Sequence, residues 1–169
     1  ILFTKRDGTG NFDKEDIFTA YVKADTSWTT PQSIAQTINS SFNEGTCTVT
    51  ADGKILIYTS CDAPDSQGSC DLYVVYKING SWQKPINMGT KVNSRSWDSQ
   101  PSLSADGRIL FFSSNRTGTK GGMDLWFAQL DKEGNPVSVN NISSLNTLEN
   151  DICPWYDTVE NRLFFSSSW

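Results

Sequence analysis

One sequence pattern returns along the whole chain at intervals of about 54 residues, and this repeat constrains the fold more than any other feature. Leu2, Leu56, Leu110 and Leu163 lie in similar apolar runs at spacings of 54, 54 and 53 residues. The runs read ILFTKRD, ILIYTSC, ILFFSSN and LFFSSSW. A fixed period of this length predicts a fold in which one structural unit is used again and again.

Further landmarks keep the same period. An aspartate opens the segments DIFTAY, DLYVVY and DLWFAQ, and an asparagine precedes an acid by five residues in each unit (Asn39, Asn93 and Asn146, followed by Glu44, Asp98 and Asp151). The segments SWTTP and SWQKP are 54 residues apart, as are TADGK and SADGR. We therefore divide one continuous region, 1–169, into repeats of approximately 1–54, 55–108 and 109–162, with a partial repeat over 163–169.

Each unit has the sequence character of β-structure. The Asp-Gly pair in ADGK and ADGR lies between two apolar runs, and this arrangement favours a β-hairpin because type I′ turns need positive φ angles. In the second unit we expect four strands, near residues 46–50, 55–60, 72–76 and 82–88. We expect aromatic side chains such as Phe111, Phe112 and Trp126 to fill the space between neighbouring units.

Four short antiparallel strands at such a period are typical of a β-propeller blade. The predicted fold class is thus all-β, with about three propeller blades and a partial one. Propellers close with four to eight blades, so we expect this sequence to be part of a longer chain. The alternatives are a ring that lacks further blades, or copies that assemble to complete it.

The segment PSLSADGRILFFSSNRTGTKGGMDLW, residues 101–126, resembles the TolB-like, WD-repeat-like propeller family. With the added W-x-x-P segment, the repeats are similar to those of OmpA-family envelope proteins of Bacteroidota, some of which belong to the gliding and type IX secretion apparatus. The outer copies depart from the pattern, since 158–162 has lost the Asp-Gly turn and the third unit has GNP in place of SWxxP. The resemblance implies a location in the periplasm or at the outer membrane, and a larger parent chain that carries a peptidoglycan-binding domain.

Composition excludes several function classes. The chain has no histidine, which removes Ser-His-Asp and Cys-His nucleophiles and histidine metal clusters. A net charge of −5 argues against a nucleic-acid partner and against an anionic membrane surface. No apolar run approaches the roughly 18 residues of a spanning helix, so we expect no direct membrane insertion. We expect no cofactor and no bound metal.

The four cysteines indicate a compartment. Cys61 and Cys70 flank the loop between the second and third strands of the second unit, a position that suits a cross-strand disulfide. The alternative is two free thiols. Cys47 and Cys153 fall in equivalent strands two units apart, which disfavours a bridge between them. A disulfide in the loop would place the protein outside the cytosol.

Acidic residues are abundant, and most of them recur in every unit. A catalytic pair of carboxylates should break the repeat, so we assign the recurring acids to backbone hydrogen bonds in the loops. The segment Asp7–Asp13 has oxygen donors at alternate positions, as a calcium loop does, but it lacks the acid at the third position and a clear terminal glutamate. We favour an ordinary solvated loop there.

Residues that break the repeat are the better candidates for function. Trp97 and Trp155 replace small or polar counterparts, and Arg95, Arg116 and Lys120 lie in nearby loops. In a propeller these loops emerge on one face, so the five residues are predicted to form an aromatic and basic binding patch. The alternative is that the tryptophans pack between blades.

These observations predict a non-enzymatic scaffold in the cell envelope, which presents a loop face to a protein partner. The alternative is a propeller that binds carbohydrate or hydrolyses glycosides, with tryptophans as platforms for sugar rings.

Overall fold

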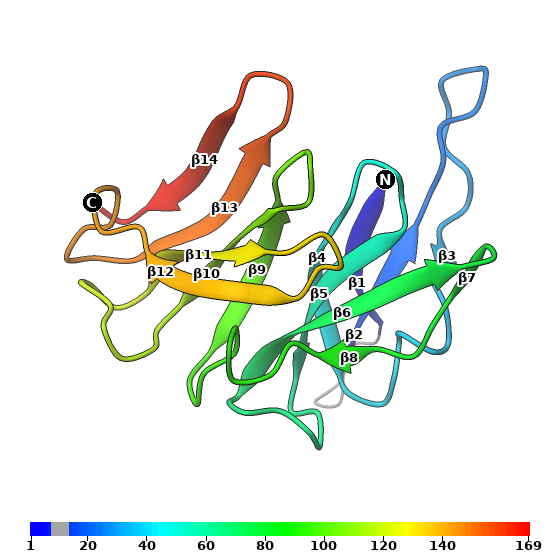
Figure 1. The fold of residues 1–169 in the computed structure, drawn as a ribbon. Helices are drawn as coiled ribbons and strands as arrows, with labels where there is room; N and C mark the ends of the chain where they lie inside the picture. The colour runs from blue at the N-terminus through cyan, green and yellow to red at the C-terminus, as the bar shows by residue number, and fades with distance from the viewer. Residues whose placement is uncertain (8–13) are drawn as a thin grey trace.

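The computed structural model describes residues 1–7 and 14–169, which form fourteen β-strands arranged in four antiparallel sheets (Figure 1). Within these residues no helix is long and apolar enough to cross a membrane. The first two sheets consist of β1 (Leu2–Asp7), β2 (Lys14–Thr19) and β3 (Gln32–Ser33), then β4 (Asn43–Val49), β5 (Ile55–Cys61), β6 (Cys70–Ile78), β7 (Ser81–Trp82) and β8 (Ile86–Asn87). The last two consist of β9 (Asp98–Leu103), β10 (Ile109–Ser114), β11 (Asp124–Leu130) and β12 (Pro136–Asn141), then β13 (Asp151–Asp157) and β14 (Arg162–Ser167).

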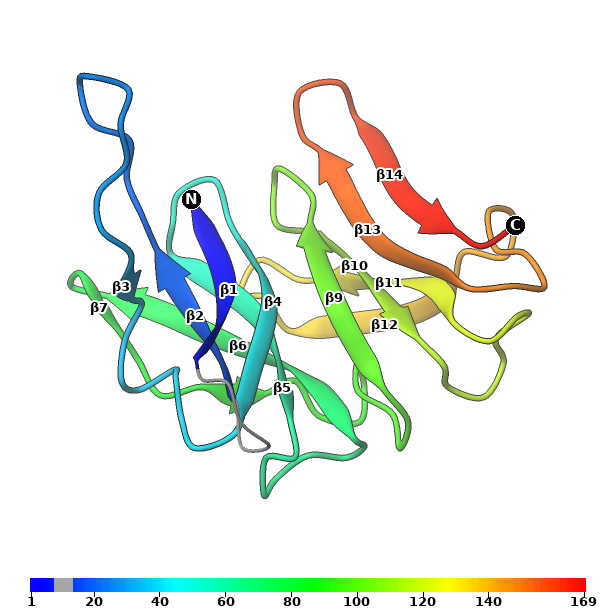
Figure 2. The same ribbon diagram turned by 180° about the vertical axis from the view of Figure 1, so that it is seen from behind.

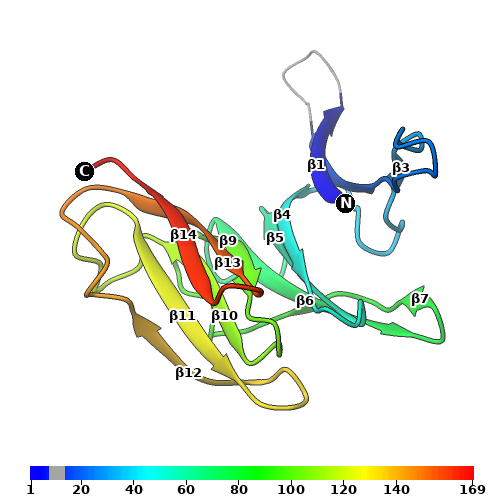
Figure 3. The ribbon, with the colours of Figure 1, turned by 90° about the horizontal axis from the view of Figure 1, so that it is seen from above.

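The four sheets are propeller blades, which confirms the predicted all-β fold class. We letter the strands of a blade A to D from the inside outwards, so that β4, β9 and β13 are A strands. Blade 1 contains strands B to D, blades 2 and 3 contain all four, and blade 4 contains A and B. Figure 2 shows β1, β4, β9 and β13 following one another across the front of the molecule, and Figure 3 shows the blades spreading from these strands.

The fourth strand of blade 2 is divided into two short pieces. We expected one strand over 82–88, but β7 pairs with the end of β6 whereas β8 pairs with its middle. Pro85 lies between the two pieces and has no backbone N–H to donate to the ladder. The outermost strand is therefore interrupted where the chain meets this proline.

The pairing of blade 1 corrects the repeat alignment by one residue. Thr4 lies opposite Ile17, whereas Thr59 lies opposite Leu72, and both apolar residues directly follow the recurring aspartate. Leu2 therefore corresponds to Ile57, and its alignment with Leu56 was wrong. Because side chains alternate between the faces of a strand, a shift of one residue moves each side chain to the other face.

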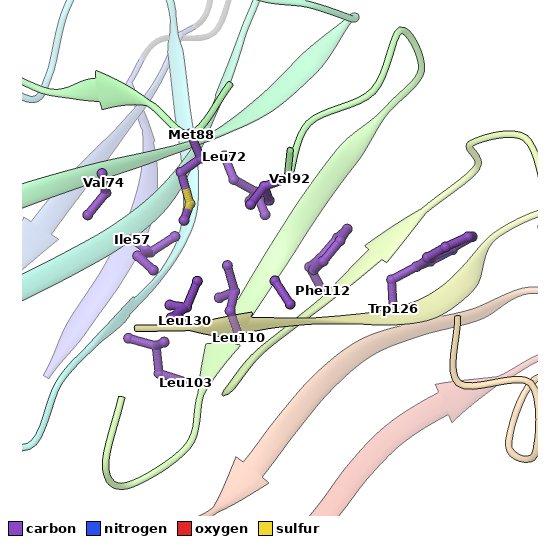
Figure 4. Packing of buried hydrophobic residues seen from close by; sticks show 11 residues of the cluster. Ile57, Leu72, Val74, Met88, Val92, Leu103, Leu110, Phe112, Trp126 and Leu130 are labelled. Carbon is purple, nitrogen blue, oxygen red and sulfur yellow. The ribbon is translucent and has the colours of Figure 1, made fainter. Parts of the chain in front are cut away.

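Apolar side chains from both faces of each inner strand fill the space between blades. In blade 2, Ile57 and Leu72 face blade 3, whereas Leu56 and Tyr58 face blade 1. Figure 4 shows the larger cluster, in which side chains of blade 2 meet those of blade 3 (Ile57, Leu72, Val74, Met88 and Val92, against Leu103, Leu110, Phe112, Trp126 and Leu130).

The aromatic residues expected between blades lie there. Phe112 is fully buried and Trp126 is nearly so, both between blades 2 and 3. Phe111 points the other way and stacks on Tyr156 of blade 4, with ring centroids 5.3 Å apart. Full burial of one such ring stabilises the fold by roughly 1.5–3 kcal/mol, so the interfaces between blades contain much of the stabilising apolar contact.

Candidate functional site: the loop face

One end of the blades is built from two kinds of loop, which connect strands B and C within a blade and strand D to the next strand A. We call this end the loop face; it lies at the bottom of Figure 2, whereas the hairpin turns between strands A and B lie at the top. The loops touch across the blade boundary, since Ser69 N donates a hydrogen bond to Ser96 O (3.1 Å). A Cβ on Gly68 would lie 1.9 Å from Ser96 O, and one on Gly121 would lie 2.0 Å from Glu149 O. Glycine therefore allows both close approaches.

A buried acid at the start of each A strand holds the loop that precedes it. Asp98 has no exposed surface and accepts hydrogen bonds from Ser94 N (2.6 Å), Ser94 Oγ (2.8 Å) and Ser114 Oγ (2.6 Å). Asp151 accepts in the same way from Thr147 N and its hydroxyl. Glu44 occupies the equivalent position of blade 2 and accepts from Ser40, while burial raises its pKa against the opposing effect of these bonds. These carboxylates are structural, as the repeat predicted.

A second buried acid, at the start of strand C, holds the loop between strands B and C. Asp71 accepts hydrogen bonds from Gln67 N (2.7 Å) and Gly68 N (3.1 Å). Asp124 accepts from Lys120 N (2.6 Å) and Gly121 N (3.1 Å). Both aspartates are fully buried. Each loop thus has two backbone N–H groups bound to a fully buried carboxylate.

The recurring asparagine acts as a clasp on strand C. The side-chain oxygen of Asn93 accepts from Leu72 N (2.8 Å), and its amide nitrogen donates to Leu72 O (3.0 Å). Asn146 makes the same pair of bonds with Leu125, at 2.8 and 2.9 Å. Asn39 repeats the pattern on Ile17. The loop leading to the next blade is therefore fastened to the blade that it leaves.

Arg116, predicted as a binding residue, is engaged inside the protein. Its guanidinium lies 2.6 Å from the carboxylate of Asp98 and also donates to Val92 O. It lies over the rings of Phe112 and Trp126, at 4.9 and 5.0 Å from their centroids. Only 12% of the side chain is exposed. Because Arg116 already contacts these groups within the protein, little of its guanidinium is accessible to a binding partner.

The two remaining cations differ in their surroundings. Lys120 is exposed, although its amine donates to Asn146 O (2.8 Å) and so ties the loop of blade 3 to the following loop. Arg95 is exposed in the loop that leads to β9. Of the three predicted basic residues, Arg95 and Lys120 are thus exposed on the loop face, whereas Arg116 is not.

Trp97 and Trp155 lie at different places. Trp97 is half-buried at the end of the loop before β9, where Asn115 accepts from its backbone N–H (2.9 Å). Trp155 lies within β13, is 59% exposed and packs on Phe164 of β14, with ring centroids 5.5 Å apart. It lines a cavity, together with Ser102 of blade 3 and with Val159 in the turn between β13 and β14, away from the loop face. The five predicted residues do not form one patch.

In other blades, the residue at the position of Trp155 contacts the next blade. In blades 2 and 3 the equivalent hydroxyls, Thr48 and Ser102, accept hydrogen bonds from backbone N–H groups of the next blade, at 3.1 Å from Leu103 N and 2.9 Å from Tyr156 N. The indole of Trp155 replaces that acceptor. The substitution by tryptophan therefore alters the side of a blade that faces the next blade in other repeats, and it does not alter the loop face.

A cavity of about 350 Å³ opens at the inner edge of the loop face, and Trp97 lines it. Glu15 of β2 and Gly45 of β4 line the same cavity, although our sequence analysis did not select them. The repeat contains a signal for both residues, since each differs from its counterparts in later blades.

The cysteines and the possible calcium loop complete the predicted features. Cys61 and Cys70 are joined by a disulfide that closes the ends of β5 and β6. Cys47 and Cys153 are free thiols, half-buried and exposed respectively. Residues 8–13 of the possible calcium loop lie outside the described residues.

Comparison with known proteins supports the fold. The chain is similar to the structure described as "putative TolB from Agrobacterium tumefaciens", with a TM-score of 0.62 and 20% identity over 98% of this chain and 50% of that one. It thus spans about half the length of that structure. A Trypanosoma rangeli sialidase matches 92% of this chain and 27% of its own, with a TM-score of 0.35 and 10% identity. No family model and no curated protein matches the chain.

Proposed function

We propose that this chain is a non-enzymatic scaffold whose loop face binds a protein partner. The observation that supports the proposal best is that the buried acidic residues of that face bind the protein's own loops. The buried carboxylates at the starts of strands A and C accept backbone or side-chain hydrogen bonds from the loops, so their role is to fix loop shape. A preorganised surface loses little conformational entropy on binding, which favours affinity.

Exposed apolar side chains on the same face suit a protein partner. Leu148 is 77% exposed and Leu145 is 39% exposed, both in the loop that leads to β13. Arg95 adds an exposed cation in the preceding loop. Apolar groups beside a guanidinium are a combination that protein interfaces favour.

We place the protein outside the cytosol, in the periplasm or at the outer membrane. The disulfide supports this, because such bonds persist in oxidising compartments. The resemblance to OmpA-family envelope repeats, and a parent chain with a peptidoglycan-binding domain, remain part of the same proposal.

Site-specific photo-crosslinking tests the proposal. A benzophenone amino acid is placed at Arg95 or Leu148 on the loop face, and at Asp52 or Val159 at the opposite end, in cells that produce the protein. We expect one discrete crosslinked protein from the loop-face positions and none from the opposite end. Equal crosslinking from both ends, or none from the loop face, would refute the proposed function.

A carbohydrate-binding function is the second candidate, because Trp97 lines a cavity together with several hydroxyl groups. A glycan array distinguishes it. Binding that is lost in Trp97→Ala would support a carbohydrate site and contradict the protein-scaffold assignment.

A further inference from the structure

The cavity at the inner edge of the loop face is lined by hydroxyl groups from three neighbouring blades. The hydroxyls of Thr46 and Thr59 lie 2.9 Å apart, and those of Thr59 and Ser99 lie 3.0 Å apart. Thr4 of blade 1 also lines the cavity, at the position that Thr59 has in blade 2. The hydroxyls of Thr46, Thr59 and Ser99 form a chain of hydrogen bonds, so this part of the cavity wall is polar and ordered.

The rim of the cavity is built from residues that depart from the repeat. Trp97 occupies the position of Asn43 and Asn150, whose side-chain oxygens accept hydrogen bonds from Glu15 N (3.1 Å) and Met123 N (3.0 Å) of the preceding blade. A tryptophan cannot accept such a bond. At this junction the backbone of Trp97 pairs directly with the backbone of Cys70, so the indole takes no part in joining the two blades.

Glu15 brings a carboxylate to the rim. Its counterparts in blades 2 and 3 are Cys70 and Met123, because each of the three directly precedes the recurring aspartate. The side chain of Glu15 is exposed, unlike the structural acids of the loop face. It is therefore available to a group that enters the cavity.

Gly45 makes room beside that carboxylate. A Cβ at this position would lie 3.4 Å from Glu15 Oε2, and the equivalent positions of blades 3 and 4 hold Ser99 and Ile152. The absence of a side chain here keeps the space next to Glu15 open. Glu15, Gly45 and Trp97, which all differ from their counterparts in the repeat, therefore line one cavity between consecutive blades.

We propose that this cavity receives a basic side chain, lysine or arginine, of the protein partner. This inference rests on the proposed function, and it specifies which type of side chain of the partner the loop face binds. An indole and a carboxylate that line the same cavity favour a cation, because a ring face attracts positive charge and a carboxylate pairs with it. The chain's net charge of −5 attracts a basic segment over longer distances.

One neighbouring charge limits the affinity. Arg6 lies opposite Glu15 in the ladder of β1 and β2, although it does not line the cavity. The positive charge of Arg6 so near to Glu15 opposes the entry of a second cation, so we expect a single free side chain to bind weakly. Binding also weakens as salt rises, since exposed charges are screened.

Titration by NMR tests the proposal with four probes: the acetylated amides of lysine, arginine and norleucine, and N-acetylglucosamine. We expect saturable shifts at the backbone amide of Gly45 and at the indole of Trp97 with the two basic probes only. Glu15→Gln removes the charge at nearly constant shape, and Trp97→Asn installs the residue that Asn43 and Asn150 show to fit this position. Each should weaken the binding of the basic probes at least about fivefold. Trp155→Ser changes a tryptophan that does not line this cavity, and it should leave binding unchanged.

The outcomes separate this inference from the proposed function. Equal shifts with norleucine, or unchanged binding in Glu15→Gln and Trp97→Asn, would overturn the basic-side-chain proposal, and shifts with N-acetylglucosamine alone would replace it with a sugar site. If the crosslink from Arg95 survives both substitutions, the scaffold function stands and the cavity proposal fails. If the basic probes bind as expected but no loop-face crosslink forms, the cavity chemistry stands and the scaffold function fails.

Discussion

Removal of one asparagine clasp should destabilise the protein by about 3 kcal/mol. Asn93 is 2% exposed, and Asn93→Ala removes its bonds to Leu72 N, Leu72 O and Asn87 Oδ1. Leu72 O keeps the bond from Met88 N, and Asn87 Oδ1 keeps that from Gly89 N. The N–H of Leu72, a fully buried residue, loses its acceptor. Such an orphaned donor costs about 1–3 kcal/mol, and the two other lost bonds add about 0.5–1 kcal/mol each.

Urea unfolding followed by circular dichroism measures this change in the free energy of unfolding. A loss of about 3 kcal/mol corresponds to a fall in Tm of about 6–12 °C for a chain of this length. Asn146→Ala should cost the same within about 1 kcal/mol, because Asn146 makes the same bonds in blade 3. Asn150→Ala is the control, since its bond to Met123 N is exposed and water can replace it. A cost for Asn93→Ala no larger than that of the control would refute the reasoning.

Three further predictions concern the cysteines and one buried acid. Replacement of Cys61 and Cys70 by alanine should lower the free energy of unfolding by about 2.5 kcal/mol, because the bridge closes a short loop; the far-ultraviolet spectrum should stay unchanged, and loss of that spectrum would contradict a merely stabilising bridge. Burial raises the pKa of the Cys47 thiol to about 11, so iodoacetamide at pH 8 should modify exposed Cys153 first, and faster reaction of Cys47 in mass spectra would refute this. Burial also raises the pKa of Glu44 above its unfolded value, so its favourable contribution is complete at low pH and is lost as pH rises through the folded pKa. Glu44→Gln should therefore gain stability relative to the native chain as pH rises above the ordinary pKa of glutamate, about 4.3, and a pH-independent difference in urea unfolding would contradict that sign.

The repeat predicted the blades and the roles of recurring residues, because those roles are local. Asp71 and Asp98 bind loops only a few residues away, so their repetition alone indicated a structural function. The disulfide could be anticipated for the same reason, since Cys61 and Cys70 lie at the two ends of one loop.

Features that depend on register or on contacts between blades could not be read from the sequence. The similar runs ILF and ILI concealed the one-residue offset of blade 1, which only the pairing of Thr4 with Ile17 reveals. Arg116 was expected at the surface because charged residues usually lie there, but its pairing with Asp98 lies within the protein. That Glu15 and Trp97 line one cavity becomes visible only when three blades are placed in space.

Hydrogen exchange measured by NMR tests most directly whether buried carboxylates hold the loop face in one conformation. The backbone amides of Gln67 and Lys120, which donate to Asp71 and Asp124, should exchange at least about a hundredfold more slowly than those of the hairpin turn at residues 51–53. Exchange at Gln67 and Lys120 as fast as in that turn would contradict a preorganised binding face.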